Sequence, residues 1–463
     1  MNANHETHTM QGVSRRGFLK STAAVGAGLA VAPTILGAEK AGPTEIKVGI
    51  IGAGTEGRVL IQQAIKIPGI KFTCLCDIWD YSQRYTGRRL HAYGHEVLEH
   101  MYKDYQDMLE KEKDRMDAVI VATPDWMHAE HAGACLEAGK QVYCEKEMSN
   151  DLAKAKSMVE TAKKTGNLLQ IGHQRRSNPR YLFAKQKLLD EAALPGRITH
   201  IYGQWNRSTA AASPRGFPKK YPIDDKTLQK YGYENMFQFR NWRFFWKYGG
   251  GAIEDLGSHQ IDIFPWFTDA KPTSVQASGG TDYWKEYETY DNILAIYTFQ
   301  GPKGIIRAFY QTLTTTSARG YYEAFMGDEG TLSISEAPAQ CRVYAEGHLP
   351  AVEGKHPWTK WVDKGYLIRV EEEEAAEEPA SAADQIMAVY KSKPPTAFMF
   401  NVEVEGSYHQ AHIQNFFDAM RDDKVELNCP ADVAYETCVM VLTANEAVKA
   451  GKTIPFTEED FKV

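Results

Sequence analysis

The sequence predicts an α/β protein that begins with a doubly wound parallel sheet and continues into an α+β domain with a largely antiparallel, open-faced sheet. Three observations support this prediction. The chain has 463 residues, which is more than one ordinary core organises, so two domains are expected. Continuous apolar runs alternate with amphipathic segments over residues 45–172. From residue 173 onward, longer aromatic-rich and strand-like runs take over.

The first domain, residues 45–172, is expected to contain buried strands separated by helices. Its apolar runs end in glycine or polar residues, as parallel strands do when they turn into helices. The expected strands lie within residues 46–54, 71–77, 116–124, 141–147 and 167–174. The expected helices are 58–67, 105–113, 128–139 and 151–165. This alternation is typical of a Rossmann domain.

The second domain, residues 173–463, has strand-like runs with polar interruptions, which suit an antiparallel sheet with one covered face. These runs are 198–205, 274–284, 292–300, 304–313 and 330–336. The segment 430–451 is expected to form a helix. The acidic segment 371–378 (EEEEAAEE) is expected to be a solvated loop.

Residues 1–40 are expected to be an export signal. A basic stretch containing Arg15 and Arg16 precedes a weakly apolar, Gly- and Ala-rich run. The arginine pair resembles the twin-arginine motif, which implies export of an already folded protein to the periplasm. A retained N-terminal anchor is the alternative, and it would be the chain's one link to a membrane.

Composition excludes one class of partner. The net charge of −7 argues against a nucleic-acid binder, which normally carries a basic face. The seven cysteines lack C-x-x-C pairs. Cys74 and Cys76 fall on the same side of an expected strand and are interpreted as buried thiols.

A glycine-rich turn follows the first expected strand. Its residues match G-x-G-x-x-G and are Gly52, Ala53, Gly54, Thr55, Glu56 and Gly57. Such a turn lets backbone amides approach a pyrophosphate at a helix N-terminus. Asp77 ends the next strand, where a carboxylate favours NAD over NADP by binding the ribose. Nearby Ser82 and Arg84 complicate that choice, and a glycine turn without a ligand is the alternative.

Two further strand ends are expected at the same crevice. One carries Thr123, Pro124 and Asp125, with His128 just beyond, and the other carries Glu145, Lys146 and Glu147. An amine placed at the end of a buried strand can bind a substrate hydroxyl. The alternative is that Lys146 and Glu145 form an ordinary surface pair.

The stretch GGGAIEDLGSHQID, residues 249–262, places Asp255, His259 and Asp262 on one face if it is helical. The glycines allow the chain to pass close to a ligand. The alternative is a capped helix whose polar face meets water.

Together, the motifs G-A-G-T-E-G, A-T-P-D-W-M-H, C-E-K-E, G-H-Q-R-R and G-G-G-A-I-E-D-L-G-S-H resemble the glucose–fructose oxidoreductase / inositol dehydrogenase / rhizopine-catabolism family. The resemblance runs from about residue 45 to the last helix. It implies that Lys146, Asp255 and His259 meet at the nicotinamide, and that His128 and Gln174 belong to the cofactor segments. Glu147 departs from the family, which usually has proline there.

The resemblance implies chemical roles. His259 is the expected general base because an imidazole titrates near neutral pH, and Lys146 would bind the same substrate oxygen. The reverse assignment, with Lys146 as the base, stays open. Asp255 would orient the alcohol or support the imidazole, and Asp262 is expected to be structural.

The expected substrate is a sugar or cyclic polyol. Candidate contacts are Arg175, Trp242, Arg243 and Tyr248, because aromatic faces cover C–H surfaces and fixed donors bind hydroxyls. Singly, such aromatics are more often core residues. No metal is expected, since His128-x-x-His131 and His409-x-x-His412 have no evident third ligand.

The leading hypothesis is an exported oxidoreductase that moves a hydride between a tightly bound NAD and a sugar or glycoside, with C3 oxidation of a glycoside as one form. The bound NAD would be recycled by a second substrate. One alternative is a glycosidase working through transient oxidation, although that branch of the family lacks the Glu145-Lys146 segment. A non-catalytic sugar-binding protein is the other. The family also implies a homo-oligomer formed through the second domain's sheet.

Overall fold

The computed structural model describes residues 45–370, 393–400, 402–404 and 406–463. The predicted export signal and the acidic segment 371–378 lie outside the described residues. Among the helices in the described ranges, none combines the length and apolar character needed to cross a bilayer.

The first sheet is parallel and has six strands in the order β3-β2-β1-β4-β5-β6. The strands are β1 (Ile46–Ile51), β2 (Ile70–Cys76), β3 (Met101–Tyr102), β4 (Ala118–Val121), β5 (Gln141–Cys144) and β6 (Leu169–Ile171). Of the two central strands, β4 is apolar throughout and β1 is apolar except for the exposed Lys47, because helices cover both faces of the sheet. This confirms the predicted doubly wound sheet.

Helices connect these strands. They are α2 (Thr55–Ala64), α3 (Asp80–Ala92), α4 (Tyr105–Glu112), α5 (His128–Glu137) and α6 (Leu152–Thr165). Asp104 and Asp151 cap α4 and α6 by accepting backbone N–H bonds, and Gly166 ends α6 in a left-handed conformation. Neither α3 nor β3 was predicted, because α3 buries only one large aliphatic side chain, Leu90, and β3 is two residues long.

The second sheet has ten strands in the order β14-β15-β13-β12-β11-β7-β10-β9-β8-β16, and only β10 and β7 pair in parallel among the described strands. The strands are β7 (Ile198–Asn206), β8 (Lys271–Gly280), β9 (Asn292–Gly301), β10 (Gly304–Leu313), β11 (Tyr321–Gly327), β12 (Gly330–Ile334), β13 (Arg342–Ala345), β14 (Ile368–Arg369), β15 (Thr396–Met399) and β16 (Ile454–Pro455). The largely antiparallel sheet is confirmed.

One face of this sheet is covered and the other is open. Along β9, Ala295 and Tyr297 are fully buried, whereas Leu294 and Ile296 are 39% and 46% exposed. The buried face packs against α11 (Ser258–Ile261), α12 (Ile263–Thr268) and the long helix α16 (Ala431–Ala450), where Tyr297 donates a hydrogen bond to the Met440 carbonyl. The predicted open-faced sheet is therefore present.

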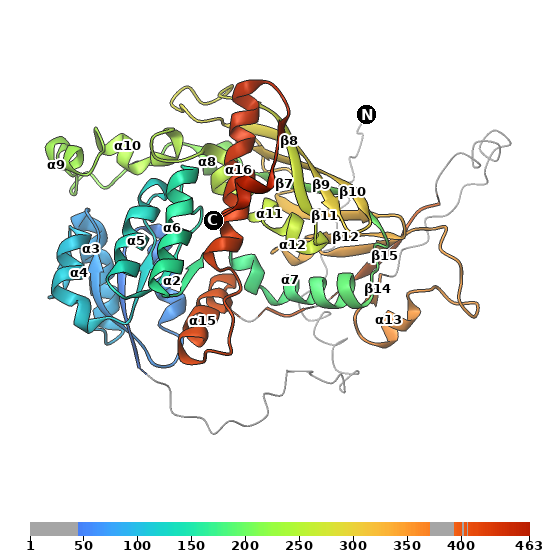
Figure 1. Ribbon diagram of the computed structural model, residues 1–463, viewed down its shortest axis with the longest axis horizontal. Helices are drawn as coiled ribbons and strands as arrows, with labels where there is room; N and C mark the ends of the chain where they lie inside the picture. The colour runs from blue at the N-terminus through green and yellow to red at the C-terminus, as the bar shows by residue number, and fades with distance from the viewer. Residues whose placement is uncertain (1–44, 371–392, 401, 405) are drawn as a thin grey trace, which may run out of the picture. The chain divides into compact units, whose positions relative to one another are not determined.

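The chain returns to the first sheet near its end. Helix α15 (Tyr408–Arg421) places Ile413, Phe416 and Phe417 in the same apolar core as β1 and β2. A C-terminal helix thus packs beside α2 on the N-terminal domain (Figure 1). The remaining α-helices in the described part of the chain are α7 (Pro179–Phe183), α8 (Thr209–Ala212), α9 (Asp225–Lys230), α10 (Met236–Arg240) and α13 (Thr359–Asp363).

A separate small core joins the segment 221–248 to the first domain. Trp126 packs against Tyr233 and Tyr248, and Trp79 packs against Phe239, all of them buried or half-buried. The indole N–H of Trp79 also donates to the carbonyl of Tyr221 at 2.6 Å. The segment 221–248, which contains α9 and α10, is thereby held over the edge of the parallel sheet.

Candidate active site

A cavity of about 830 Å³ opens at the carboxyl ends of β1, β2, β4 and β5, where parallel α/β sheets bind their ligands. The predicted site residues that line it are Gly52, Gly54, Thr55, Glu56, Asp77, Thr123, Pro124, Glu145, Lys146, Gln174, Trp242, Arg243, Asp255 and His259. The structure therefore gathers most of the predicted cofactor and substrate residues in one place.

The glycine-rich turn is shaped to admit a ligand. Gly52 has φ +96°, and an added Cβ there would lie 2.4 Å from the Ala122 carbonyl oxygen. A Cβ on Gly57 would lie 2.0 Å from the Gly52 carbonyl oxygen. Gly54, in contrast, faces open space in the cleft. The turn fits a dinucleotide pyrophosphate at the N-terminus of α2.

Asp77 closes the turn from the end of β2. Its carboxylate accepts hydrogen bonds from the backbone N–H groups of Ala53 and Trp79, each at 2.8 Å. Burial raises the pKa of Asp77 to about 6. The carboxylate fixes the turn while still facing the cavity, which is the position from which a ribose hydroxyl is bound.

The end of β5 presents Lys146 to the cavity. Its side-chain amine donates to the backbone carbonyl of Asp255, and its backbone N–H donates to Glu145 at 3.2 Å. Burial raises the pKa of Glu145 to about 7. Because Glu145 is buried and the amine reaches into the second domain, the alternative of a surface pair is excluded.

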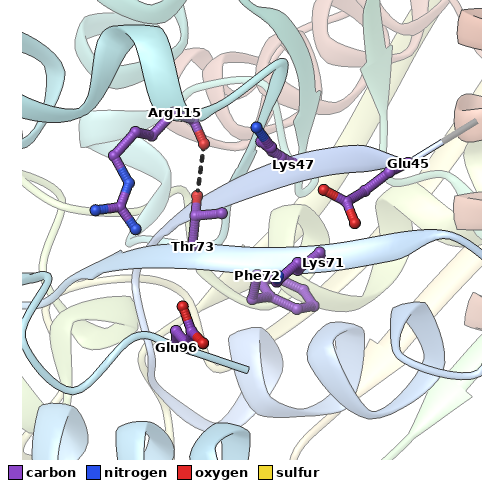
Figure 2. Close-up of a pocket in the computed structure, with 7 residues that line it drawn as sticks. All are labelled: Glu45, Lys47, Lys71, Phe72, Thr73, Glu96 and Arg115. Atoms are coloured by element: carbon purple, nitrogen blue, oxygen red, sulfur yellow. Dashed lines mark hydrogen bonds between the residues drawn. The ribbon is translucent and has the colours of Figure 1, made fainter. Parts of the chain in front are cut away.

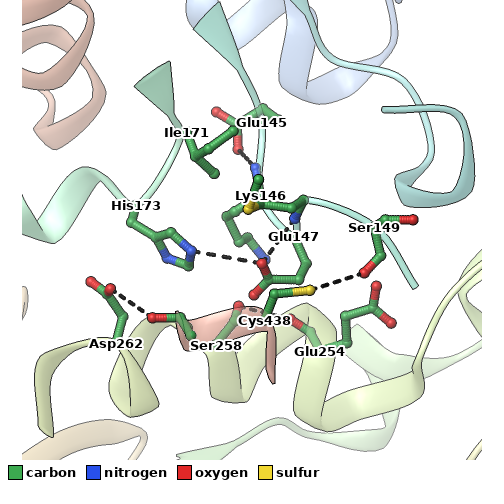
Figure 3. Close-up of polar contacts among 12 residues, drawn as sticks. Glu145, Lys146, Glu147, Ser149, Ile171, His173, Glu254, Ser258, Asp262 and Cys438 are labelled. Carbon is green, nitrogen blue, oxygen red and sulfur yellow. Dashed lines mark hydrogen bonds and ion pairs between the residues drawn. The ribbon is translucent and has the colours of Figure 1, made fainter. Parts of the chain in front are cut away.

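Glu147 is the residue that departs from the resemblance, at a position where that family usually has proline. Figure 3 shows its fully buried carboxylate pointing toward His173, with the two groups 3.9 Å apart. The carboxylate also accepts the backbone N–H of Met148 at 2.8 Å. These contacts lie on the side of the strand end away from the cavity, so the substitution leaves Lys146 in the cleft.

Asp255 and His259 come from a helical stretch that is not a regular α-helix. Residues Ile253–Gly257 form a π-helical turn, which widens the spacing before α11 begins at Ser258. The simple i, i+4 spacing predicted for a regular α-helix is therefore corrected, although both side chains do line the cavity. π-helical turns occur frequently at functional sites.

Asp255 is held by two arginines. Arg243 donates to one carboxylate oxygen at 2.7 Å, and Arg207 donates to the other at 3.2 Å. Although burial opposes it, the charges of Arg243, Arg207 and Lys146 keep the pKa of Asp255 well below its ordinary value. The carboxylate is ionised at any working pH.

His259 is a neutral imidazole at the cavity wall. Burial and then the charge of Lys146 lower its pKa well below the ordinary value. Its Nδ1 atom has no hydrogen-bond partner within the described part of the chain, and its ring lies 5.3 Å from that of Trp205. The titration near neutral pH expected from the sequence is therefore not found: the ring is neutral and has an unpartnered nitrogen that can accept a proton, but it is a weaker base than an ordinary imidazole.

Two predicted substrate contacts are corrected. Arg175 is completely buried, where it pairs with Glu323 and with Glu336 at 3.5 Å, and it does not reach the cavity. Tyr248 is also buried, and its hydroxyl donates to the Gly232 carbonyl at 2.7 Å. Both side chains supply structure rather than a surface for a ligand.

Three predicted cofactor contacts lie behind the cavity wall. His128 is fully buried between the carbonyl groups of Glu147 and Thr123, at 2.7 and 2.8 Å. Ala53 and Gly57 are buried in the turn itself. These residues shape the wall from behind.

Asp262 accepts a hydrogen bond from Arg176 at 2.9 Å, which agrees with its expected structural role.

Several cavity residues escaped the sequence analysis, and these are Trp79, Trp205, Arg207, Arg215, Arg240, Tyr287 and His409. His409 comes from α15 and pairs with Glu56 at 3.3 Å. The one available signal was the polar sequence Trp205-Asn206-Arg207 at the end of an expected strand. The others are brought in by tertiary structure.

A second, smaller cavity of about 220 Å³ lies at the opposite ends of β1 and β2 (Figure 2). It is lined by Lys47, Lys71 and other charged residues, together with Thr73, whose hydroxyl donates to the Arg115 carbonyl at 2.9 Å. None of the predicted site residues lies there. Among the described residues, no cluster of three potential metal ligands is found.

Two family models match the chain. Residues 46–173 match the oxidoreductase family with an NAD-binding Rossmann fold, and residues 226–333 match the GFO/IDH/MocA C-terminal domain. An inositol 2-dehydrogenase from Rubrobacter xylanophilus is 30% identical over 400 residues, covering 78% of this chain and 98% of the relative. The chain belongs to this family. It is an NAD-binding oxidoreductase.

Other relatives align less completely. The uncharacterised oxidoreductase YrbE of Bacillus subtilis is 31% identical over 235 residues, so the match spans 51% of this chain and 57% of YrbE. A scyllo-inositol 2-dehydrogenase (NAD⁺) of the same species is 24% identical, over 63% of this chain and 74% of that enzyme.

Solved structures share the fold. The WlbA dehydrogenase of Bordetella pertussis, in complex with NADH and UDP-GlcNAcA, superimposes with a TM-score of 0.61 at 17% identity, covering 89% of this chain and 99% of that one. A levoglucosan dehydrogenase in complex with NADH gives a TM-score of 0.63 at 18% identity, covering 89% and 100%. The two-domain architecture is therefore that of known dehydrogenases.

Proposed function

We propose that the protein oxidises a secondary hydroxyl of a sugar or glycoside, or reduces the matching keto group, with NAD as the hydride carrier. The observation that carries this proposal is the meeting of Lys146, Asp255 and His259 in the cavity that begins at the glycine-rich turn. When bound, NAD supplies the acceptor for the hydride that leaves the substrate carbon.

Three residues of the chain bind the substrate and move its hydroxyl proton. The neutral His259 takes the hydroxyl proton as the carbon–oxygen double bond forms, so the substrate loses one proton and one hydride. Lys146 lies beside it and binds the same oxygen. Asp255 is ionised and fixed by two arginines, and it holds a neighbouring hydroxyl in place.

We further propose that the protein is exported through its N-terminal arginine pair with NAD already bound, and that a second sugar returns the coenzyme to its starting state. The basis is the sequence pattern of residues 14–20 and the scarcity of free coenzyme outside the cytoplasm. Oxidation of a glycoside at C3 is one form of this reaction. A homo-oligomer formed through the open sheet face belongs to the same proposal.

The test is to purify the protein without added coenzyme, denature one portion and identify any nicotinamide released. An undenatured portion is titrated with glycosides and keto-sugars while the absorbance of reduced nicotinamide is followed. Release of stoichiometric NAD, together with absorbance changes of opposite sign for the two kinds of sugar, supports the proposal. Release of aglycone without net redox change would favour a glycosidase, and no response to any sugar would favour a binding protein.

Chain location has its own test. Cells are fractionated in three cases. They express the unmodified chain, a variant with Arg15 and Arg16 both changed to Lys, or the unmodified chain in a host that lacks twin-arginine transport. Protein in the periplasm only when the unmodified chain is expressed in a host with twin-arginine transport supports export. The same distribution in all three cases would contradict it.

A further inference from the structure

The substrate end of the cavity carries more positive charge than its own residues neutralise. Lys146, Arg207 and Arg243 contact Asp255, which is ionised, and Arg215 lies near Arg207 and Arg243; all four cations line the cavity. Both carboxylate oxygens of Asp255 are already taken by Arg243 and Arg207, as described above. One negative charge is thus shared by two arginines, while further cations stand close by.

Of these four cations, Arg215 is the one whose side chain has no partner among the described residues. Within the described residues, its guanidinium makes no hydrogen bond or ion pair, although it is exposed to the cleft. Its backbone is fixed by the buried Asn241, which accepts the Arg215 N–H at 2.6 Å and donates to its carbonyl at 3.2 Å. The chain therefore holds this arginine in place without a counter-ion.

The neighbouring charges make the position of Arg215 unfavourable in the protein alone. The surrounding protein and then the like charges of Arg243 and Arg207 lower the pKa of Arg215. Among the other acids beside the site, Glu56 has a lowered pKa, but its carboxylate is paired with His409 at 3.3 Å. Burial raises the pKa of Asp125 to about 7 and raises that of Glu254 well above its ordinary value. Bound NAD would place its pyrophosphate at the glycine-rich turn and its positively charged nicotinamide near these cations.

Flat aromatic surfaces stand next to these cations. Trp205 faces His259, and Tyr287 stacks on Phe244 with ring centroids 3.6 Å apart. All four residues line the cavity. A ring with C–H faces suits these aromatic surfaces, and an anionic group suits an arginine fork. The same ligand is thus required to carry both features.

We propose that the substrate is a sugar acid, a pyranose or glycoside bearing a carboxylate, and that Arg215 pairs with this carboxylate beside Arg207 and Arg243. The inference rests on the proposed function and narrows its substrate class. A planar carboxylate matches the two parallel N–H groups of a guanidinium. Its charge relieves the repulsion among the three arginines.

The test compares methyl glucuronide with methyl glucoside, which have the same ring but differ in the carboxylate, and adds glucose 6-phosphate as a second anion. The NAD-loaded wild type, Arg215→Gln and the matched control Arg88→Gln on the exposed side of α3 are assayed for kcat/KM. We expect the wild type to prefer the acid. The acid-to-neutral ratio should fall about 10- to 100-fold in Arg215→Gln, the range for a charge-assisted pair, and stay unchanged in the control.

Equilibrium binding of the same three compounds separates this inference from the proposed function. Acid binding that weakens in Arg215→Gln, without any change in nicotinamide absorbance, would support the sugar-acid site and reject the oxidoreductase reaction. Three outcomes would each overturn the inference. The wild type uses the acid and the neutral sugar equally, it prefers the phosphate, or Arg215→Gln binds the acid as tightly as the wild type does.

Discussion

Substitution of the buried Arg175 tests whether this residue supports the fold or binds the substrate. Its guanidinium pairs with Glu323 and Glu336, and Tyr181 donates a further hydrogen bond to Glu323 at 2.8 Å. The side chains of Arg175 and Glu323 have no exposed surface. The substitution Arg175→Met fills similar volume but leaves two carboxyl groups buried without their cation.

The expected cost follows from this geometry. Removing one partner of a buried ion pair typically destabilises a protein by about 3–5 kcal/mol. Burial already raises the pKa of Glu323 even with Arg175 beside it, so the variant is expected to protonate this group. The folded-state pKa of Glu323 in the variant then lies above the unfolded value of about 4.3. Below that pH the carboxyl is protonated in both states, so its burial without Arg175 costs no stability. As pH rises above that value, the cost grows by up to about 1.4 kcal/mol per pH unit until the folded-state pKa is passed.

The assay is urea unfolding followed by far-UV circular dichroism at about pH 5 and pH 8. Arg175→Met should lose more stability at the higher pH, and the exposed control Arg88→Met should stay within about 0.5 kcal/mol of the wild type. The double variant Arg175→Met/Glu323→Leu should recover part of the loss. An Arg175→Met protein of wild-type stability that no longer binds sugar would refute the structural assignment and restore the role expected from sequence.

Three further predictions follow from other contacts. Gly57→Ala should abolish NAD binding, measured by calorimetry, since the new Cβ would lie 2.0 Å from the Gly52 carbonyl oxygen; retained affinity would contradict the turn geometry. Burial of the His409 imidazole opposes its protonation, but Glu56 raises the pKa of His409 above its ordinary value. The pair therefore stabilises the fold below about pH 6.5, and this stability is lost as pH rises through the His409 pKa. Glu56→Gln should flatten the dependence of Tm on pH in that window, and an unchanged slope would exclude the pair. Ile296→Asp, on the open sheet face, should shift the molar mass in light scattering from oligomer to monomer, and an unaltered mass would exclude this face as the interface.

The parallel sheet and the glycine-rich turn could be predicted because their signals are local. Residues 46–57 contain a complete apolar strand, the turn glycines and the start of α2. The cavity position of Lys146 followed from the rule that strand ends share one edge. Here a short stretch of sequence determines both the backbone path and the direction of the side chain.

Arg175 shows why the same rule fails elsewhere. It follows β6, whose end lies at the correct edge, yet its side chain turns to Glu323, which is 148 residues away in the sequence. Arg215 and His409 reach the cavity from a loop after β7 and from α15. Their placement depends on how the second domain and the returning helix pack, and no spacing pattern records such long-range packing.

The seven cysteines have a consequence for the conditions under which this chain folds. All seven thiols are free and buried. Burial raises the pKa of Cys74 to about 12 and raises that of Cys76 well above its ordinary value. A protonated thiol without solvent access is a poor nucleophile and reacts slowly with oxidants. The folded domain therefore contains no cross-link that oxidation must create or that reduction can break, and its stability is indifferent to the redox poise of its surroundings.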